Sequence, residues 1–194
     1  MLLLAFYPLI VLAGIVYEQM LWMILGVVAL FVLRLLGVML SKPGGAMPVA
    51  RKDLLPLTVI LAVFGIALSL GSALLGRYQL LFFYPVVVSL GLLVLFAGSL
   101  YKGMPMVERI ARLQDPDLPA QAVAYTRKVT QVWCCFFLLN SSIALATCLY
   151  GDMKVWGVYN GVISYVLLGT LMAGEWLVRK KVQRKNAELL NDKN

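Results

Sequence analysis

Six long apolar segments, separated by short polar connections, occupy most of this 194-residue chain. Most of them approach the ~20 residues that a helix needs to cross ~30 Å of hydrocarbon. The sequence therefore predicts an all-α, polytopic membrane protein whose six transmembrane helices form one domain, residues 1–178, followed by a basic tail, residues 179–194. The predicted spans are residues 2–16, 20–40, 55–75, 80–101, 129–150 and 155–178.

The composition requires lipid as the solvent for these segments. Hydrophobic residues make up 62% of the chain and charged residues only 13%, which is more apolar surface than one globular core of this length can hide. The first span is short, but no Lys or Arg precedes it and no small-residue cleavage site follows it. We therefore interpret it as a retained helix.

The basic residues predict the orientation of the helices, because Lys and Arg in short loops resist translocation. Only Arg77 and Lys154, among the 17 Lys and Arg residues, fall in turns that a six-helix threading places outside the cell. The others lie in the second and fourth connections, in the tail, or, for Arg34, near the inner end of the second span. Both termini are therefore expected in the cytoplasm.

The fourth connection, residues 102–128, is the one soluble segment with internal patterning. Pro105 suits a first helical turn, Met106, Val107, Ile110 and Leu113 share one face, and Glu108 can pair with Arg112. The sequence predicts a short cytoplasmic amphipathic helix, ended by the prolines of residues 115–119. Two interpretations stay open: a connector that lies on the membrane, or a docking surface for a cytosolic partner.

The positive charge of +8 favours membranes and acidic proteins as partners. The basic residues flank membrane spans and lack the interleaved aromatics of a nucleic-acid platform, so we expect no nucleic acid. Anionic lipid head groups attract such residues by about 1 kcal/mol each. The residues predicted for cytosolic docking are Arg109, Arg112, Arg127, Lys128, Arg179, Lys180 and Lys181.

The chain offers little to catalysis. It contains no histidine, which removes the usual general base and the His-containing triads. Its three cysteines, Cys134, Cys135 and Cys148, lack metal-ligand spacing and are expected to be free thiols. We predict no catalytic residue, no metal and no cofactor.

Polar residues inside the apolar segments are costly and usually face a partner or a cavity. Arg34 and Glu175 lie at similar predicted depths and are expected to interact, although snorkelling of Arg34 and pairing of Glu175 with Arg179 explain them equally well. Asn140 and Asn160 fit either hydrogen bonds between helices or a substrate site.

Small residues recur at helical spacing in two spans, where they allow close approach of another helix. They either pack helices within one chain or join two copies in a homo-oligomer. The predicted packing residues are Gly65 and Ser69 in the third span, and Gly157 and Gly161 in the sixth.

Several segments together resemble a known family. They are residues 105–113, 115–119, 124–134, 136–137 with Asn140, 159–161 and 174–175. With these segments the chain resembles an uncharacterised family of bacterial inner-membrane proteins whose genes lie beside those for acyl carrier proteins, ketosynthases and acyltransferases of aryl-polyene or fatty-acid-like pathways. It is more distantly similar to the intracellular septation protein A (YciB-like) family, which is linked to envelope integrity.

This resemblance implies a bacterial inner-membrane protein in envelope-lipid or aryl-polyene biosynthesis. We expect a non-enzymatic platform that binds an acidic cytosolic partner, either an acyl carrier protein or another cytosolic enzyme of the acyl pathway. A small lipid carrier or flippase, with a cavity near Asn140, Asn160, Arg34 and Glu175, is the alternative. An intramembrane acyl-transfer enzyme using Glu175 is the third. A tightly packed bundle with an ordered fourth connection favours the platform, and a lipid-sized polar cavity favours transport.

Overall fold

The computed structural model describes residues 25–26, 28–30, 32–33, 36, 48–76, 78–101, 103–112 and 116–191. Side chains are described from residue 59 to residue 180 within these ranges, except Tyr78, and for the isolated residues before 37. This part of the chain is helical and contains no strand. The predicted span 2–16 lies outside it, and the predicted span 20–40 is represented only by isolated helical residues.

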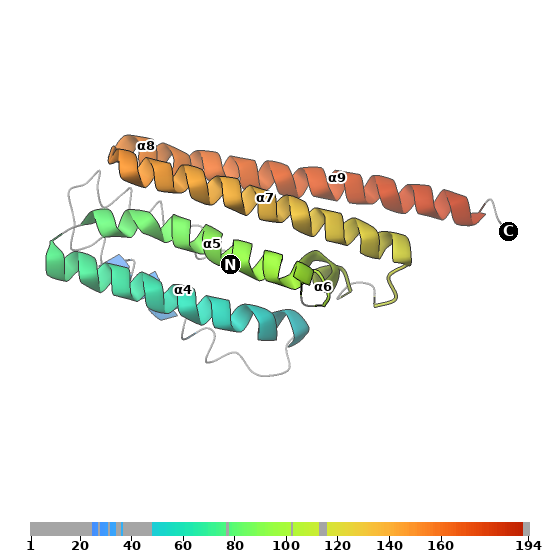
Figure 1. Cartoon of the computed structure of the whole chain (residues 1–194), viewed down its shortest axis with the longest axis horizontal. Helices are drawn as coiled ribbons and strands as arrows, with labels where there is room; N and C mark the ends of the chain where they lie inside the picture. Colours follow the sequence, from blue (N-terminus) through green and yellow to red (C-terminus); the bar gives the residue numbers. More distant parts are fainter. Residues whose placement is uncertain are drawn as a thin grey trace.

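Four long helices run alongside one another, each reversed in direction relative to the preceding one (Figure 1). They are α4 (Pro48–Leu75), α5 (Tyr84–Tyr101), α7 (Ala120–Tyr150) and α9 (Ser164–Asn191). The shorter elements are the 3-10 helix η1 (Tyr78–Phe83), α6 (Met106–Arg112), α8 (Met153–Val158) and the π-helix η2 (Tyr159–Ile163). The last two continue into α9 and form one rod with it.

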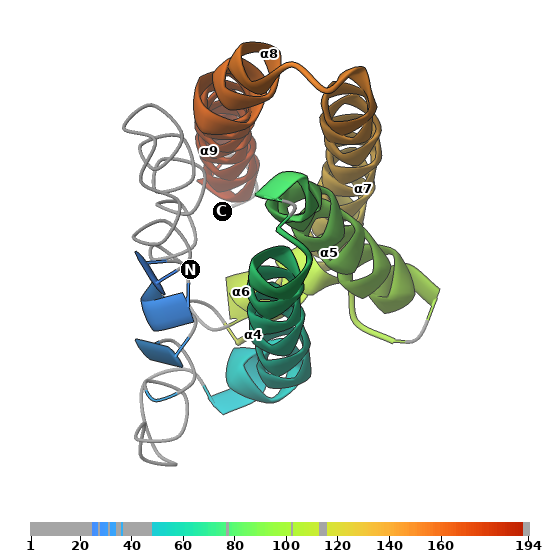
Figure 2. The ribbon, with the colours of Figure 1, turned by 90° about the vertical axis from the view of Figure 1, so that its left-hand side faces the viewer.

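The arrangement is clearest along the helix axes, where α5 lies between α4 and α7 (Figure 2). The rod of α8, η2 and α9 meets α7 through its first two parts. Because the helices alternate in direction, the described residues of the fourth connection lie at the same end as the start of α4 and the end of α9 (Figure 1). We call this the basic end, and the opposite end, with η1 and the turn before α8, the far end.

Two residues make the reversal between α7 and α8 at the far end. Gly151 ends α7 with φ +77°, a left-handed conformation that other residues adopt only with strain. Asp152 then begins α8, and its carboxylate accepts hydrogen bonds from the main-chain N–H groups of Lys154 (2.7 Å) and Val155 (3.2 Å). The fifth and sixth predicted spans are therefore joined by a tight, capped turn.

The helices extend beyond the predicted spans at the basic end. The third and fifth spans were predicted to begin at residues 55 and 129, whereas α4 begins at Pro48 and α7 at Ala120. The predicted tail is helical as far as Asn191. Polar residues such as Arg, Lys and Gln are good helix formers in water, so hydropathy marks where lipid ends and not where the helix ends.

One cluster of buried apolar residues, which includes Leu81, Phe82 and Trp156, lies at the far end of the bundle. Trp156 is fully buried, and its ring stacks on Phe82 at 4.7 Å between centroids. The main-chain oxygen of Phe82 accepts two hydrogen bonds of 3.0 Å, one from the Trp156 indole and one from the Cys148 thiol. These contacts attach η1 to both α7 and α8. The exterior of the bundle, in contrast, is apolar: Leu74 is 86% exposed and Val94 is 72% exposed.

Candidate docking end and intramembrane polar network

The helix α6 is held against the bundle through its own backbone. The main-chain N–H of Met106 donates to the hydroxyl of Ser99 on α5 (2.9 Å), and that of Val107 donates to the hydroxyl of Thr130 on α7 (3.4 Å). The first N–H groups of a helix have no partner within it, so these hydroxyls cap α6 while tying it to two long helices. The prediction of a short helix after Pro105 is therefore confirmed.

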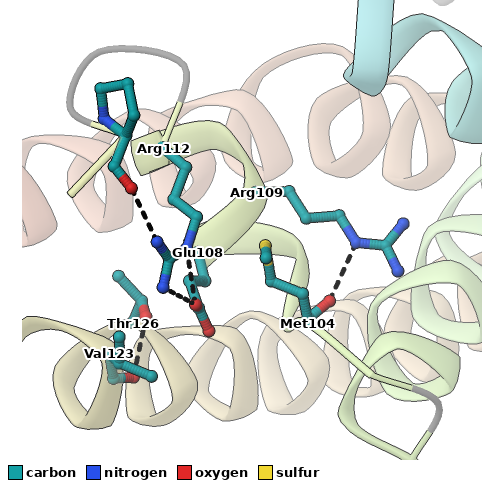
Figure 3. A network of polar contacts seen from close by, with 7 residues as sticks. Met104, Glu108, Arg109, Arg112, Val123 and Thr126 are labelled. Carbon is teal, nitrogen blue, oxygen red and sulfur yellow. Dashed lines mark hydrogen bonds and ion pairs between the residues drawn. The ribbon is translucent and has the colours of Figure 1, made fainter. Parts of the chain in front are cut away.

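A buried ion pair forms the centre of this end of the molecule (Figure 3). Glu108 is 5% exposed, and its Oε1 accepts from both Nε and Nη2 of Arg112, each at 2.9 Å. Nη1 of Arg112 donates to the main-chain oxygen of Pro116 at 2.7 Å. The predicted pairing of Glu108 with Arg112 is confirmed. All three guanidinium nitrogens of Arg112 bond to groups of the protein. Arg112 therefore stabilises the fold of the basic end and presents little of its charge to a partner.

Two further arginines bind main-chain oxygens near the end of α5. Arg127 Nη2 donates to Leu100 at 3.2 Å, and Arg109 Nε donates to Met104 at 2.9 Å (Figure 3). Carbonyl groups at a helix C-terminus lack partners and carry partial negative charge, which favours such cations. Lys128, next to Arg127, is exposed. The structure therefore gathers four of the predicted docking residues around α6.

The apolar face of α6 is buried only in part. Met106 is 2% exposed and Val107 half-buried, but Ile110 is 44% exposed, and Leu113 lies outside the described residues. At Ile110 the apolar face therefore stays on the surface of the protein. The reason is that hydrogen bonds from the backbone and the buried Glu108 set the rotation of this short helix.

Contacts between the long helices place the predicted residues of α9 at the same end. The Tyr125 hydroxyl donates to the main-chain oxygen of Glu175 at 3.4 Å, which aligns α7 with α9. The Glu175 carboxylate lies 3.7 Å from Arg179, and Lys180 lies 3.8 Å from the ring centroid of Trp176. Arg34 and the side chain of Lys181 lie outside the described residues, so the pairing of Arg34 with Glu175 stays a prediction.

A polar network links three helices within the apolar part of the bundle. The Asn140 amide donates to the hydroxyl of Ser89 on α5 at 2.9 Å, and its oxygen accepts from the hydroxyl of Tyr159 on η2 at 3.1 Å. Asn140 itself lies on α7. Both ends of its side chain therefore join neighbouring helices, which favours the interpretation of this residue as a packing element over that of a substrate ligand.

Asn160 has a different environment. Its amide nitrogen donates to the Thr147 hydroxyl (3.2 Å) and to the main-chain oxygen of Trp156 (3.1 Å), while the Thr147 hydroxyl donates to Ala144 at 2.7 Å. These acceptors fix which end of the amide is which. Its buried Oδ1 has no hydrogen-bond partner among the described residues. It lies in the π-helix η2, a wide turn that often occurs at functional sites and that the sequence did not reveal.

We expect replacement of Asn140 by leucine to lower stability by about 1–2 kcal/mol, because it removes two hydrogen bonds between helices, each worth on average about 0.6 kcal/mol in membranes, and leaves their partners unmatched. Thermal unfolding of the purified protein in detergent measures this loss. The matched control is Ser142→Ala, because the exposed Ser142 hydroxyl bonds only within its own helix. Equal stability of the two variants would contradict a structural role for Asn140.

The predicted packing residues divide into buried and open positions. Gly65 and Ser69 are buried on α4, where the serine hydroxyl donates to the glycine carbonyl at 2.8 Å, and Gly157 is buried on α8. A Cβ added at Gly161 would meet no atom within 4 Å. The first three therefore lie against other parts of the chain, while the contribution of Gly161 to packing or to a homo-oligomer stays a prediction.

The described residues show no grouping of three or more His, Cys, Asp or Glu side chains that could hold a metal ion. All three cysteines are free thiols there, as expected. Glu108 forms an ion pair with Arg112, and Glu175 forms one with Arg179.

Three helices in the described part of the chain are long and apolar enough to cross a membrane: Gln79–Tyr101, Ala120–Tyr150 and Met153–Lys180. With their exposed apolar side chains, they indicate an all-α membrane protein. Comparison of the chain with models of protein families, with curated proteins and with solved structures found no match. The family resemblance stays a prediction.

Proposed function

We propose that this chain is a six-helix protein of the bacterial cytoplasmic membrane, whose basic end is a non-enzymatic platform for an acidic cytosolic partner. The observation that carries the proposal is the docking of α6, whose backbone is capped by Ser99 and Thr130 and whose side chains include the Glu108–Arg112 pair. A connector that only joins two spans does not need such fixed geometry. A docking surface gains affinity from it, because less conformational freedom is lost on binding.

Charge supports an acidic partner. Arg127, Lys128 and Lys180 are exposed at this end, whereas Glu108 is buried and Glu175 faces Arg179. Positive surfaces of this kind attract acidic proteins and speed their association. Acyl carrier proteins are generally acidic, so a role in making an envelope lipid or an aryl-polyene-type acyl product fits the surface. Replacing Arg127 and Lys128 with glutamine, while keeping Arg112, tests the proposal through loss of that partner.

The alternating direction of the described helices supports the proposed membrane topology. The basic residues of α6, the start of α7 and the end of the α9 span lie at one end, while Lys154 lies at the other (Figure 1). Since basic residues favour the cytoplasmic side, we place the basic end and both termini in the cytoplasm.

Cysteine labelling in intact cells is expected to modify a cysteine at position 154 from outside and to leave cysteines at positions 102 and 181 unmodified, because the basic end faces the cytoplasm. The background for this test replaces the three natural cysteines with serine, which at position 148 keeps a donor for the Phe82 carbonyl. Permeabilised cells provide the control that all positions react. Labelling of a cysteine at position 102 or 181 from outside intact cells would show that the basic end faces outward and that the proposed orientation is wrong.

One observation favours a lipid carrier or flippase as the second candidate. Asn160 keeps a buried acceptor without a partner among the described residues, inside a π-helix. In a carrier, the Asn160 Oδ1 would accept a hydrogen bond from the lipid as η2 changes conformation. Asn160→Leu would then abolish lipid movement between the leaflets of reconstituted vesicles. The third candidate, an acyl-transfer enzyme using Glu175, is weakened by the ion pair of Glu175 with Arg179.

A further inference from the structure

The end of the α9 span carries a cation that is positioned by an aromatic ring. Lys180 Nζ lies 3.8 Å from the ring centroid of Trp176, one helical turn earlier. Helical side chains lean toward the N-terminus of their helix, and α9 runs toward the basic end. The Lys180 side chain therefore points back toward the apolar span. A cation held over an indole face in this way is stabilised by the negative potential of the ring.

The surroundings of this pair are apolar and open. Trp176 is 45% exposed, Leu177 60% and Val178 50%, and no residue from Ser164 to Lys180 is buried. Tryptophan and lysine are both enriched where a transmembrane helix meets the head-group layer. The contact between Tyr125 and Glu175 places Trp176 near the level of Arg127 on α7, which donates to the Leu100 carbonyl near the end of α5. The pair therefore lies at the edge of the lipid-facing surface.

Among the described residues, the charges nearby leave Lys180 without an anion. Glu175, the carboxylate on the same helix, is paired with Arg179 at 3.7 Å. No carboxylate lies within ion-pair distance of Lys180 in the part of the chain that the structure describes. For an ammonium group at the edge of the apolar span, the nearest anions are the phosphate groups of the bilayer.

We propose that Trp176 and Lys180 form a binding site for the phosphate of an anionic phospholipid, with the acyl chains lying along the exposed apolar side of α9. The site lies on α9, beside the platform surface around α6, with Lys180 belonging to the same basic end. Lipid binding there does not depend on which protein binds around α6. The site uses Lys180 as the phosphate-binding group and Trp176 as the residue that positions it. The chemistry that it recognises is a phosphate monoanion or diester next to an apolar chain.

Native mass spectrometry of the full chain tests the site. The protein is reconstituted in nanodiscs of equal parts phosphatidylglycerol and phosphatidylcholine, released, and analysed for the lipids that it retains. We expect wild type to retain phosphatidylglycerol preferentially, and Lys180→Gln to reduce that preference about fivefold, which corresponds to about 1 kcal/mol per basic residue near the surface. Lys180→Arg should keep the preference, and Trp176→Leu should weaken it.

The matched control is Lys154→Gln, which removes an exposed lysine that has no ring contact among the described residues at the opposite end of the same rod. Thermal unfolding verifies that each variant is folded. A Lys180→Gln variant with the wild-type lipid preference, or a Lys154→Gln variant with the same loss, would overturn the proposal. A second arm adds inorganic phosphate in excess: retained lipid supports a lipid site, whereas displacement of the lipid by phosphate assigns the site to the free anion and overturns the proposal.

Discussion

Replacement of Arg112 by methionine is expected to lower the free energy of unfolding by about 3 kcal/mol, the lower end of the range for breaking a buried ion pair. The loss leaves Glu108 as a carboxylate that is 5% exposed and without its cation. It also removes the hydrogen bond from Nη1 to Pro116, which holds the chain after α6. We expect a loss of stability at the low end of that range because the Arg112 side chain is 32% exposed. Thermal and denaturant unfolding in detergent measure it.

Two further variants separate this ion pair from a general effect of lost charge. Arg127→Met removes an exposed arginine of the same end and should cost less than about 1 kcal/mol. Replacing Glu108 and Arg112 together with methionine should recover most of the loss, since apolar residues of similar volume often replace a buried pair without cost. A variant lacking Arg112 that is as stable as the Arg127 variant would show that the pair does not hold α6 in place.

Replacement of both Arg127 and Lys128 by glutamine is expected to weaken binding of an acidic cytosolic protein about tenfold or more. Two exposed ion pairs contribute up to about 2 kcal/mol, and tenfold corresponds to 1.4 kcal/mol. Stability should change by no more than about 1 kcal/mol, because both side chains are exposed and the Arg127–Leu100 hydrogen bond is an exposed one. Titration of nanodisc-bound protein with a purified acyl carrier protein as the probe measures the effect.

The salt dependence of binding and a control variant test whether this weakening is an effect of charge at the basic end. Binding to wild type should fall as ionic strength rises, because exposed charges are screened beyond ~8 Å at physiological salt, and the variant should depend on salt less. Lys154→Gln, at the far end, should bind like wild type. Equal binding by wild type and the Arg127/Lys128 variant would mean that charge on α7 does not recruit the probe.

The sequence predicted those features that depend on local spacing or on bulk hydropathy. Glu108 and Arg112 are four residues apart on a short helix after Pro105, so their pairing follows from helix geometry alone. The apolar runs of α5 and α7 likewise identified helices that can cross a membrane. The prediction was poorer at Ala120 and Asn191, where helices continue into polar sequence that hydropathy assigns to connections.

The features that escaped prediction depend on contacts between distant parts of the chain. Ser99 and Thr130 cap α6, but they lie on α5 and α7, and hydroxyls in apolar segments usually bond within their own helix. The π-helix at Asn160 has no sequence signature in its five residues. Tertiary packing sets both, so neither periodicity nor composition indicates them. The stacking of Lys180 on Trp176, in contrast, was available from their spacing of four residues.

Purification from the native membrane tests whether the basic end recruits an acidic cytosolic protein. Wild type, the Arg127→Gln/Lys128→Gln variant and Lys154→Gln are isolated in parallel in a mild detergent, and the copurifying proteins are quantified. We expect an acidic soluble protein of an acyl-chain pathway to copurify with wild type and with Lys154→Gln, and to be lost from the Arg127/Lys128 variant. Recovery of the same proteins with all three would contradict the platform and favour the transport hypothesis.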